Sequence, residues 1–171
     1  MKKKLFKNDL ERLFISDLKH LYYVEKESTK ALVRIQKPMN KEDVIEVSIF
    51  ALEHTVMNKV RIEEIFDDLK IKPKGKKSRG IDGIISESKE IIKKSAKLTY
   101  VVIDAALLTV ILRILSYKTS AYKTLISYAK LLDNDFAASL LHSCYTDNLI
   151  TEKKITLRLN KRVKTKEVKL S

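Results

Sequence analysis

The chain has 171 residues, 44% of them apolar and only three Gly and two Pro, which suits one domain built from long helices. No run of 18 apolar residues occurs, and the basic start MKKKLF leads into NDLERLF, so neither membrane insertion nor a secretory signal is expected. The net charge of +13 makes binding to anionic surfaces conceivable, and the single cysteine favours a reducing cytoplasm.

The first two predicted helices are long and amphipathic. Residues 10–36 form the first, which ends before Pro38 because the residue preceding proline avoids the α region. Asn40 is expected to cap the second helix, over residues 41–69. Spacings of three and four residues give the predicted core stripes. These are Phe14, Leu18, Leu21, Glu25, Ser28 and Leu32 in the first helix, and Ile45, Ile49, Leu52, Val56 and Val60 in the second, continued by Ile62, Ile65 and Leu69 with some drift.

The second half of the chain repeats this arrangement after a basic loop over residues 70–80. A shorter helix over residues 81–95 is expected to cross the bundle, and long helices follow over residues 101–132 and 135–160. One residue of Asp133-Asn134-Asp135 is expected to cap the last helix. Two helical pairs joined by a crossover predict an all-α, ferritin-like antiparallel four-helix bundle over residues 1–160, with a frayed basic tail at 161–171. No repeat of 30–45 residues supports an α-solenoid.

Several ionisable groups interrupt the predicted core stripes. Glu25, Glu53 and Asp147 lie in or beside them, and Lys118 lies one turn beyond Leu115. A buried carboxylate needs a partner, and in a carboxylate-bridged bundle that partner is a pair of iron or manganese ions. Such a site takes glutamates from all four helices and Glu-x-x-His from two, and this chain offers too few of these ligands.

Four stretches resemble the YciF-like ferritin-like proteins, a bacterial family linked to stress responses. They are LKHLYYVEKESTKAL at 18–32, IFDDLKIKPKGKKSRGIDGIISESKEII at 65–92, DAALLTVILRILSYKTSAYKTL at 104–125 and AASLLHSCYTDNLITEKKITLRL at 137–159. The resemblance covers residues 10–160 and implies a ferritin-like bundle and a homodimer.

The metal ligands that the resemblance implies carry over poorly. The family's first glutamate matches Glu25, and its Glu-x-x-His matches Glu53 with Val56 in place of histidine. Its two acidic positions on the third helix are Leu115 and Lys118 here. The residual carboxylates that a metal site could use are Glu25, Glu53, Asp147 and Glu152. A diiron site is therefore not expected.

We hypothesise that Lys118 replaces the lost cations by forming an internal ion pair with Glu25. The alternative is that Lys118 extends to solvent past Tyr122 while Glu25 is hydrated. An ion pair of this kind would hold the helices in register without any open coordination position.

Three functions are compatible with these features. The favoured one is a non-catalytic, stress-associated protein without a cofactor that acts by association as a homodimer, through exposed apolar residues of the first two helices. The second is a metal-binding protein that holds iron or manganese at the residual carboxylates. The third is binding of nucleic acid or an anionic surface through the basic tails and the loop residues Lys70, Lys72, Lys74, Lys76, Lys77 and Arg79.

Overall fold

The computed structural model describes the backbone of residues 2–167 and the side chains of residues 7–161, and within these bounds the protein is helical without strands. The helices are α1 (Lys2–Gln36), α2 (Glu42–Asp68), α3 (Arg79–Lys94), the 3-10 turn η1 (Ser95–Lys97), α4 (Tyr100–Leu131) and α5 (Asp135–Glu167). The prediction of an all-α bundle with a short crossover helix is confirmed.

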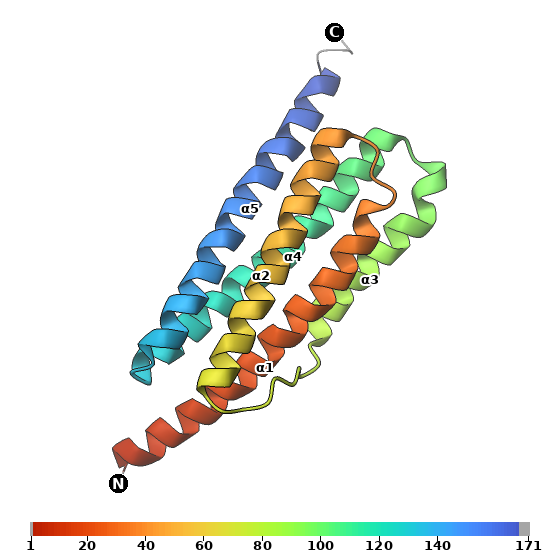
Figure 1. The fold of residues 1–171 in the computed structure, drawn as a ribbon. Helices are drawn as coiled ribbons and strands as arrows, with labels where there is room; N and C mark the ends of the chain where they lie inside the picture. Colours follow the sequence, from red (N-terminus) through yellow and green to blue (C-terminus); the bar gives the residue numbers. More distant parts are fainter. Residues whose placement is uncertain (1, 168–171) are drawn as a thin grey trace.

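Four long helices form the bundle, and α3 lies against its side (Figure 1). Helix α1 packs against α2 and α4, and α5 packs against the same two helices, so α1 and α5 occupy opposite corners. Helix α3 packs on α1 and α4. This arrangement lets each long helix direct one face toward a shared centre.

Two turns end helices with residues in the left-handed conformation. Lys70 (φ 55°) follows α2, and the Ile71 N–H donates to Phe66 O while the Lys70 N–H donates to Asp67 O, which is a Schellman motif. Asp133 (φ 59°) ends α4 in the same way. Asn134 then caps α5, because its Oδ1 accepts the Ala137 N–H at 2.9 Å, which confirms the cap predicted for this turn.

Three boundary predictions were wrong or incomplete. Helix α1 begins at Lys2, before the predicted start at residue 10. The residue that caps α2 is Lys41, whereas Asn40 donates its backbone N–H to Asp104 and its side-chain amide to Pro38 O. Helix α5 continues to Glu167, past the predicted end at residue 160, and residues 168–171 lie outside the described part. No Gly or Pro interrupts this segment, so its sequence holds no residue that would end the helix at 160.

The predicted core stripe of the second helix was wrong in part. Ile62 and Ile65 are buried as expected, and Ile45 and Leu52 are half-buried against the core, but Ile49, Val56 and Val60 are 42%, 40% and 45% exposed. The fully buried positions are Val44, Ser48, Ala51, Thr55, Asn58, Ile62, Ile65 and Phe66. Apolar residues occur on more than one side of α2 and its core face includes three polar residues, so hydrophobic spacing alone does not separate the two sides. The stripe predicted for the first helix is buried as expected.

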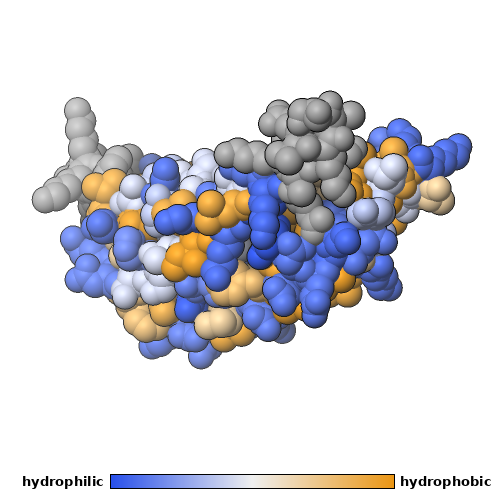
Figure 2. Space-filling model, turned by 90° about the horizontal axis from the view of Figure 1, so that it is seen from above, coloured by the Kyte–Doolittle hydropathy of each residue, from blue (hydrophilic) through white to orange (hydrophobic). Residues whose placement is uncertain are grey.

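Helix α4 is the most buried of the long helices. It is long and apolar enough by composition to span a membrane, and a core helix passes the same test. Ten of its apolar residues are buried inside the bundle, as are Asp104 and Lys118. Hydrophilic residues dominate the face of the molecule seen in Figure 2, with smaller hydrophobic areas between them.

Candidate functional site

A layer of polar side chains divides the core into two apolar clusters. One cluster surrounds Leu32, Ile111 and Ile155, and the other surrounds Phe14, Phe66 and Leu141. Between them every long helix contributes at least one polar residue that is at most 1% exposed. These residues are Glu25 and Ser28 of α1, Thr55 and Asn58 of α2, Lys118 of α4, and Asn148 and Thr151 of α5.

Lys118 and Glu25 meet at the centre of this layer. Lys118 Nζ lies 2.8 Å from Glu25 Oε2, and the two side chains are 1% and 0% exposed. The ammonium also donates to Thr55 Oγ1 at 3.1 Å, and the Tyr122 hydroxyl donates to Glu25 Oε1. Lys118 and Tyr122, both on α4, therefore each place a donor beside one carboxylate oxygen of Glu25.

Burial dominates the protonation of these groups. Removal from water raises the pKa of Glu25, although the Lys118 ammonium and the Tyr122 hydroxyl act in the opposite direction. Burial and the neighbouring Glu25 raise the pKa of Tyr122 well above 10. Burial likewise raises the pKa of the Cys144 thiol to about 12. Neither Tyr122 nor Cys144 is therefore prepared to act as an anion at neutral pH.

The rest of the layer is joined by hydrogen bonds between α2, α4 and α5. Asn148 Nδ2 donates to Leu115 O at 2.8 Å and to Thr119 Oγ1 at 2.7 Å. Asn58 Oδ1 accepts from Arg61 at 2.8 Å, and Arg61 also pairs with Asp147. Thr151 is the layer's one hydroxyl beside an imidazole, with Oγ1 3.2 Å from His54 Nδ1, and it donates its proton to Asp147 O at 2.7 Å. These contacts therefore join the helices, since the threonine proton is held by a backbone carbonyl.

The spacing of the layer matches a diiron bundle while its chemistry does not. Such bundles take single glutamates from two helices and Glu-x-x-His pairs from the other two. Here the single positions are Glu25 and Lys118, and the paired positions, three residues apart, are Thr55 and Asn58 on α2 and Asn148 and Thr151 on α5. An ammonium, two hydroxyls and two amides cannot replace carboxylates and imidazoles around two cations. The residues present therefore do not fit a diiron centre.

The four residual carboxylates are spread over the molecule. Glu25 is paired with Lys118, Asp147 with Arg61, and Glu152 accepts from Ser116 at 3.0 Å. Glu53, which the sequence placed beside the core stripe, is exposed. Among the residues whose side chains are described, no three His, Cys, Asp or Glu side chains are gathered to hold a metal ion.

The predicted lost-ligand positions need one correction. Leu115 and Lys118 are buried at 2% and 1%, but Val56 is 40% exposed and does not face the centre. The polar residues of α2 that do face the centre, Thr55 and Asn58, were not identified from the sequence. The available signal was the three-residue spacing of polar groups on α2, which repeats in Asn148 and Thr151 on α5.

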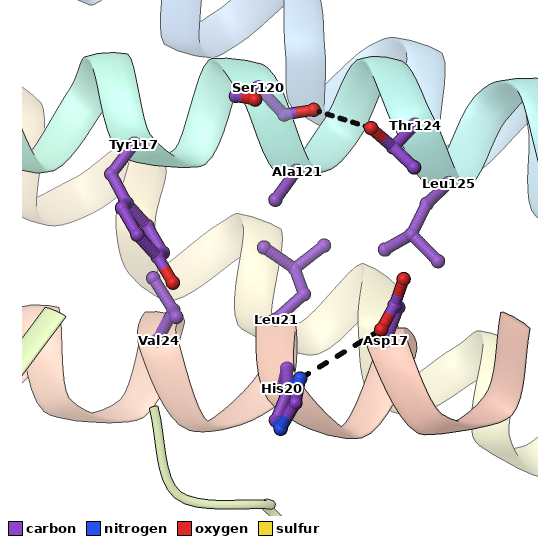
Figure 3. A pocket seen from close by; sticks show the side chains of 9 residues that line it. All are labelled: Asp17, His20, Leu21, Val24, Tyr117, Ser120, Ala121, Thr124 and Leu125. Atoms are coloured by element: carbon purple, nitrogen blue, oxygen red, sulfur yellow. Dashed lines mark hydrogen bonds and ion pairs between the residues drawn. The ribbon is translucent and has the colours of Figure 1, made fainter. Parts of the chain in front are cut away.

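A surface groove of about 280 Å³ lies between α1 and α4 near the polar layer (Figure 3). Leu21, Val24 and Leu125 line it, and each is 1% exposed, so they separate the groove from Glu25. Asp17 and His20, 3.8 Å apart, form part of its α1 wall. Of its polar side chains, Asp17 is already paired with His20 and the Tyr117 hydroxyl with Ser78, so the groove is a weaker candidate than the polar layer.

The chain matches a known protein family and a bacterial relative. Residues 9–167 match the family described as "Domain of unknown function (DUF892)". The chain belongs to this family. Protein YciF of Escherichia coli (strain K12) is 30% identical over 148 residues, covering 86% of this chain and 88% of that protein. The ferritin-like, YciF-like resemblance read from the sequence is confirmed.

Two solved structures share the fold of this chain. The crystal structure of the E. coli stress protein YciF has a TM-score of 0.84 and 28% identity, over 91% of this chain and 97% of that chain. The structure of YcfI from Rhodopseudomonas palustris has a TM-score of 0.79 and 27% identity, over 86% of this chain and 92% of that chain. The bundle is therefore the common architecture of these proteins.

Proposed function

We propose that this protein is a non-catalytic, ferritin-like protein that acts by association and uses no metal cofactor. The observation that carries this proposal is the position of Lys118 Nζ, 2.8 Å from Glu25 Oε2 at the centre of the polar layer. The ammonium supplies one fixed positive charge where a diiron bundle would hold two cations. It has three donors and no acceptor, so it neutralises Glu25 without offering an open coordination position.

Metal analysis tests this proposal. Protein purified from cells grown with added iron or manganese, then dialysed, is expected to retain less than about 0.1 equivalent of either metal, against about two for a complete diiron bundle. Retention of one or more equivalents would overturn the proposal.

A ligand-restoring variant serves as the positive control. It combines Thr55→Glu, Asn58→His, Lys118→Glu, Asn148→Glu and Thr151→His, which together recreate the two single and two paired positions of a diiron bundle. This variant is expected to retain metal where the natural protein does not. A second variant with the same five substitution types at exposed positions distinguishes a formed centre from added surface ligands.

Association is proposed to use the exposed side of α1 and α2. We call Val33, Ile49, Val56, Met57 and Val60 the α1–α2 patch; each is 40–49% exposed. Val33 lies on the same α1 stripe as Tyr22, whose hydroxyl donates to Glu63 of α2, so the two helices present these apolar residues together. Exposed apolar residues gathered on one face favour a protein partner, and we infer a second copy of this chain.

Light scattering after size-exclusion chromatography tests the dimer. The natural protein is expected to have the mass of a dimer at tens of micromolar, and Val56→Lys with Val60→Lys is expected to give a monomer. Leu131→Lys changes a residue that is 62% exposed at the end of α4 and is expected to leave the dimer intact. A natural protein that is monomeric, or a dimer unaffected by the α2 substitutions, would contradict this assignment.

The cellular role that we propose is a stress response in the cytoplasm. Its support is the description of the E. coli relative as a stress protein. The expected result is a rise in the abundance of this protein when its host meets osmotic or oxidative stress, measured by quantitative immunoblotting of cytoplasmic and membrane fractions. Constant abundance under both stresses would argue against the role.

A further inference from the structure

The segment that joins α2 to α3 concentrates positive charge. Six of the ten residues 70–79 are lysine or arginine, and none is acidic. We call these six residues the basic ridge; all are exposed. They are Lys70, Lys72, Lys74, Lys76, Lys77 and Arg79.

Backbone contacts fix the basic ridge against α1. The Lys76 N–H donates at 3.0 Å to the backbone carbonyl of Lys19, which lies within α1. A Cβ at Gly75 would lie 3.1 Å from Tyr23 Cβ, so glycine allows the loop to approach α1 closely. The Lys76 ammonium also donates to Ser16 Oγ at 3.0 Å.

The far end of the basic ridge is fixed to α4. Ser78 Oγ lies 2.8 Å from Tyr117 Oη, and a Cβ at Gly80 would lie 2.8 Å from the Tyr117 ring. The Tyr23 hydroxyl donates to Asp82 at 2.8 Å, which ties the first turn of α3 to α1. The segment is therefore an ordered array of cations and differs from a solvated connection that moves freely.

Most of these cations lack an acidic partner. Lys77 lies 3.8 Å from Asp82, a carboxylate that already accepts from Tyr23. Within the described part of the chain, Lys72, Lys74 and Arg79 form no ion pair with a carboxylate. Holding like charges together in a fixed segment costs free energy, and a polyanion would recover it by replacing the small counterions.

We propose that the basic ridge binds the phosphate backbone of a nucleic-acid duplex without sequence preference. Lysine-rich arrays contact phosphates, whereas binding of single strands uses aromatic side chains on which bases stack. The ridge has no aromatic residue, and the hydroxyls of its neighbours Tyr23 and Tyr117 are bonded to Asp82 and Ser78. A membrane surface is the less favoured partner, because Ile71, the isoleucine within the segment, packs against the bundle core and is not free to insert.

Fluorescence anisotropy with a labelled 20-base-pair DNA tests the proposal. Affinity is measured between 50 and 200 mM salt for the natural protein and for Lys72→Gln/Lys74→Gln/Arg79→Gln. The matched control, Lys93→Gln/Lys94→Gln/Lys97→Gln, removes the same charge from exposed residues at the opposite end of α3, roughly 20 Å away along the helix.

The ridge variant is expected to bind at least about tenfold more weakly at 50 mM salt, and its slope of log affinity against log salt is expected to fall by about 3. The control is expected to keep the natural slope and to stay within about twofold of the natural affinity. Equal losses in both variants would show that net charge alone is responsible and would overturn the site. Absence of binding to the duplex at 50 mM salt, or binding only to phosphatidylserine vesicles, would overturn it as well. The dimer assay is a separate measurement, so the two proposals fail independently.

Discussion

Lys118→Met removes the positive charge from the polar layer while nearly keeping the length of the side chain. Glu25 would then remain 0% exposed with one oxygen facing no cation, and Thr55 would lose the ammonium as a donor. Breaking a buried pair in this way costs about 3–5 kcal/mol, because it leaves an uncompensated charge out of water. For a protein of this size that loss corresponds to a fall in Tm of about 6–20 °C.

Glu25→Gln leaves the opposite charge unpaired and is expected to cost a similar amount, whereas the double variant removes both charges. The neutral amide of the double variant still accepts the Tyr122 hydroxyl, so its free energy of unfolding should return to within about 2 kcal/mol of the natural value. The two substitutions are therefore expected to be strongly non-additive, with a coupling free energy of several kcal/mol.

Urea unfolding followed by circular dichroism measures the change in the free energy of unfolding for Lys118→Met, for Glu25→Gln and for the double variant. The matched control is Arg113 with Glu87, a pair whose side chains are 53% and 52% exposed, for which the coupling should not exceed about 1 kcal/mol. Additive losses below about 1 kcal/mol for both single variants at the buried pair would refute the reasoning, since they would mean that water reaches Glu25 and Lys118.

Further predictions concern titration, thiol reactivity and helix termination. Burial, together with the Glu63 carboxylate, raises the pKa of Tyr22 to about 12. A hydrogen bond to Asp82 raises the pKa of Tyr23 to about 12, and burial raises the pKa of Tyr122 well above 10. Because the unfolded tyrosines lose their protons near pH 10 and the folded ones do not, stability should fall as pH rises from 10 to about 12. Absorbance at 295 nm should show these three of the seven tyrosines ionising late or only on unfolding; full ionisation at pH 10.5 without unfolding would contradict this. Cys144, with its pKa raised to about 12, should react with a thiol reagent at pH 8 no faster than the protein unfolds, and a rapid stoichiometric reaction would show that the thiol is accessible. Lys70→Gly should raise the free energy of unfolding by about 1 kcal/mol, because the left-handed conformation strains any residue with a Cβ; an unchanged urea midpoint would argue against that strain.

Local signals in the sequence were sufficient for the helical architecture. The scarcity of Gly and Pro, the break at Pro38 and the turn at Asp133-Asn134-Asp135 located the long helices to within a few residues, apart from the extensions of α1 and α5. The polar residues of α1 were also predictable, because Glu25 and Ser28 interrupt a clear apolar stripe. On α2 the same method was right only in part, since the exposed Ile49, Val56 and Val60 follow helical spacing while the buried Ser48, Thr55 and Asn58 are polar.

The amino-acid sequence by itself determined the helices, their order and the shortage of acidic ligands, because each depends on residue types and on neighbours within a few turns. Only the tertiary structure decided that Thr55 and Asn58, and not Glu53 and Val56, face the centre, and that Lys118 Nζ meets Glu25 there. The physical reason is that helix rotation is set by the packing of all four helices together. A stripe read from one helix cannot distinguish a core face from an exposed apolar face.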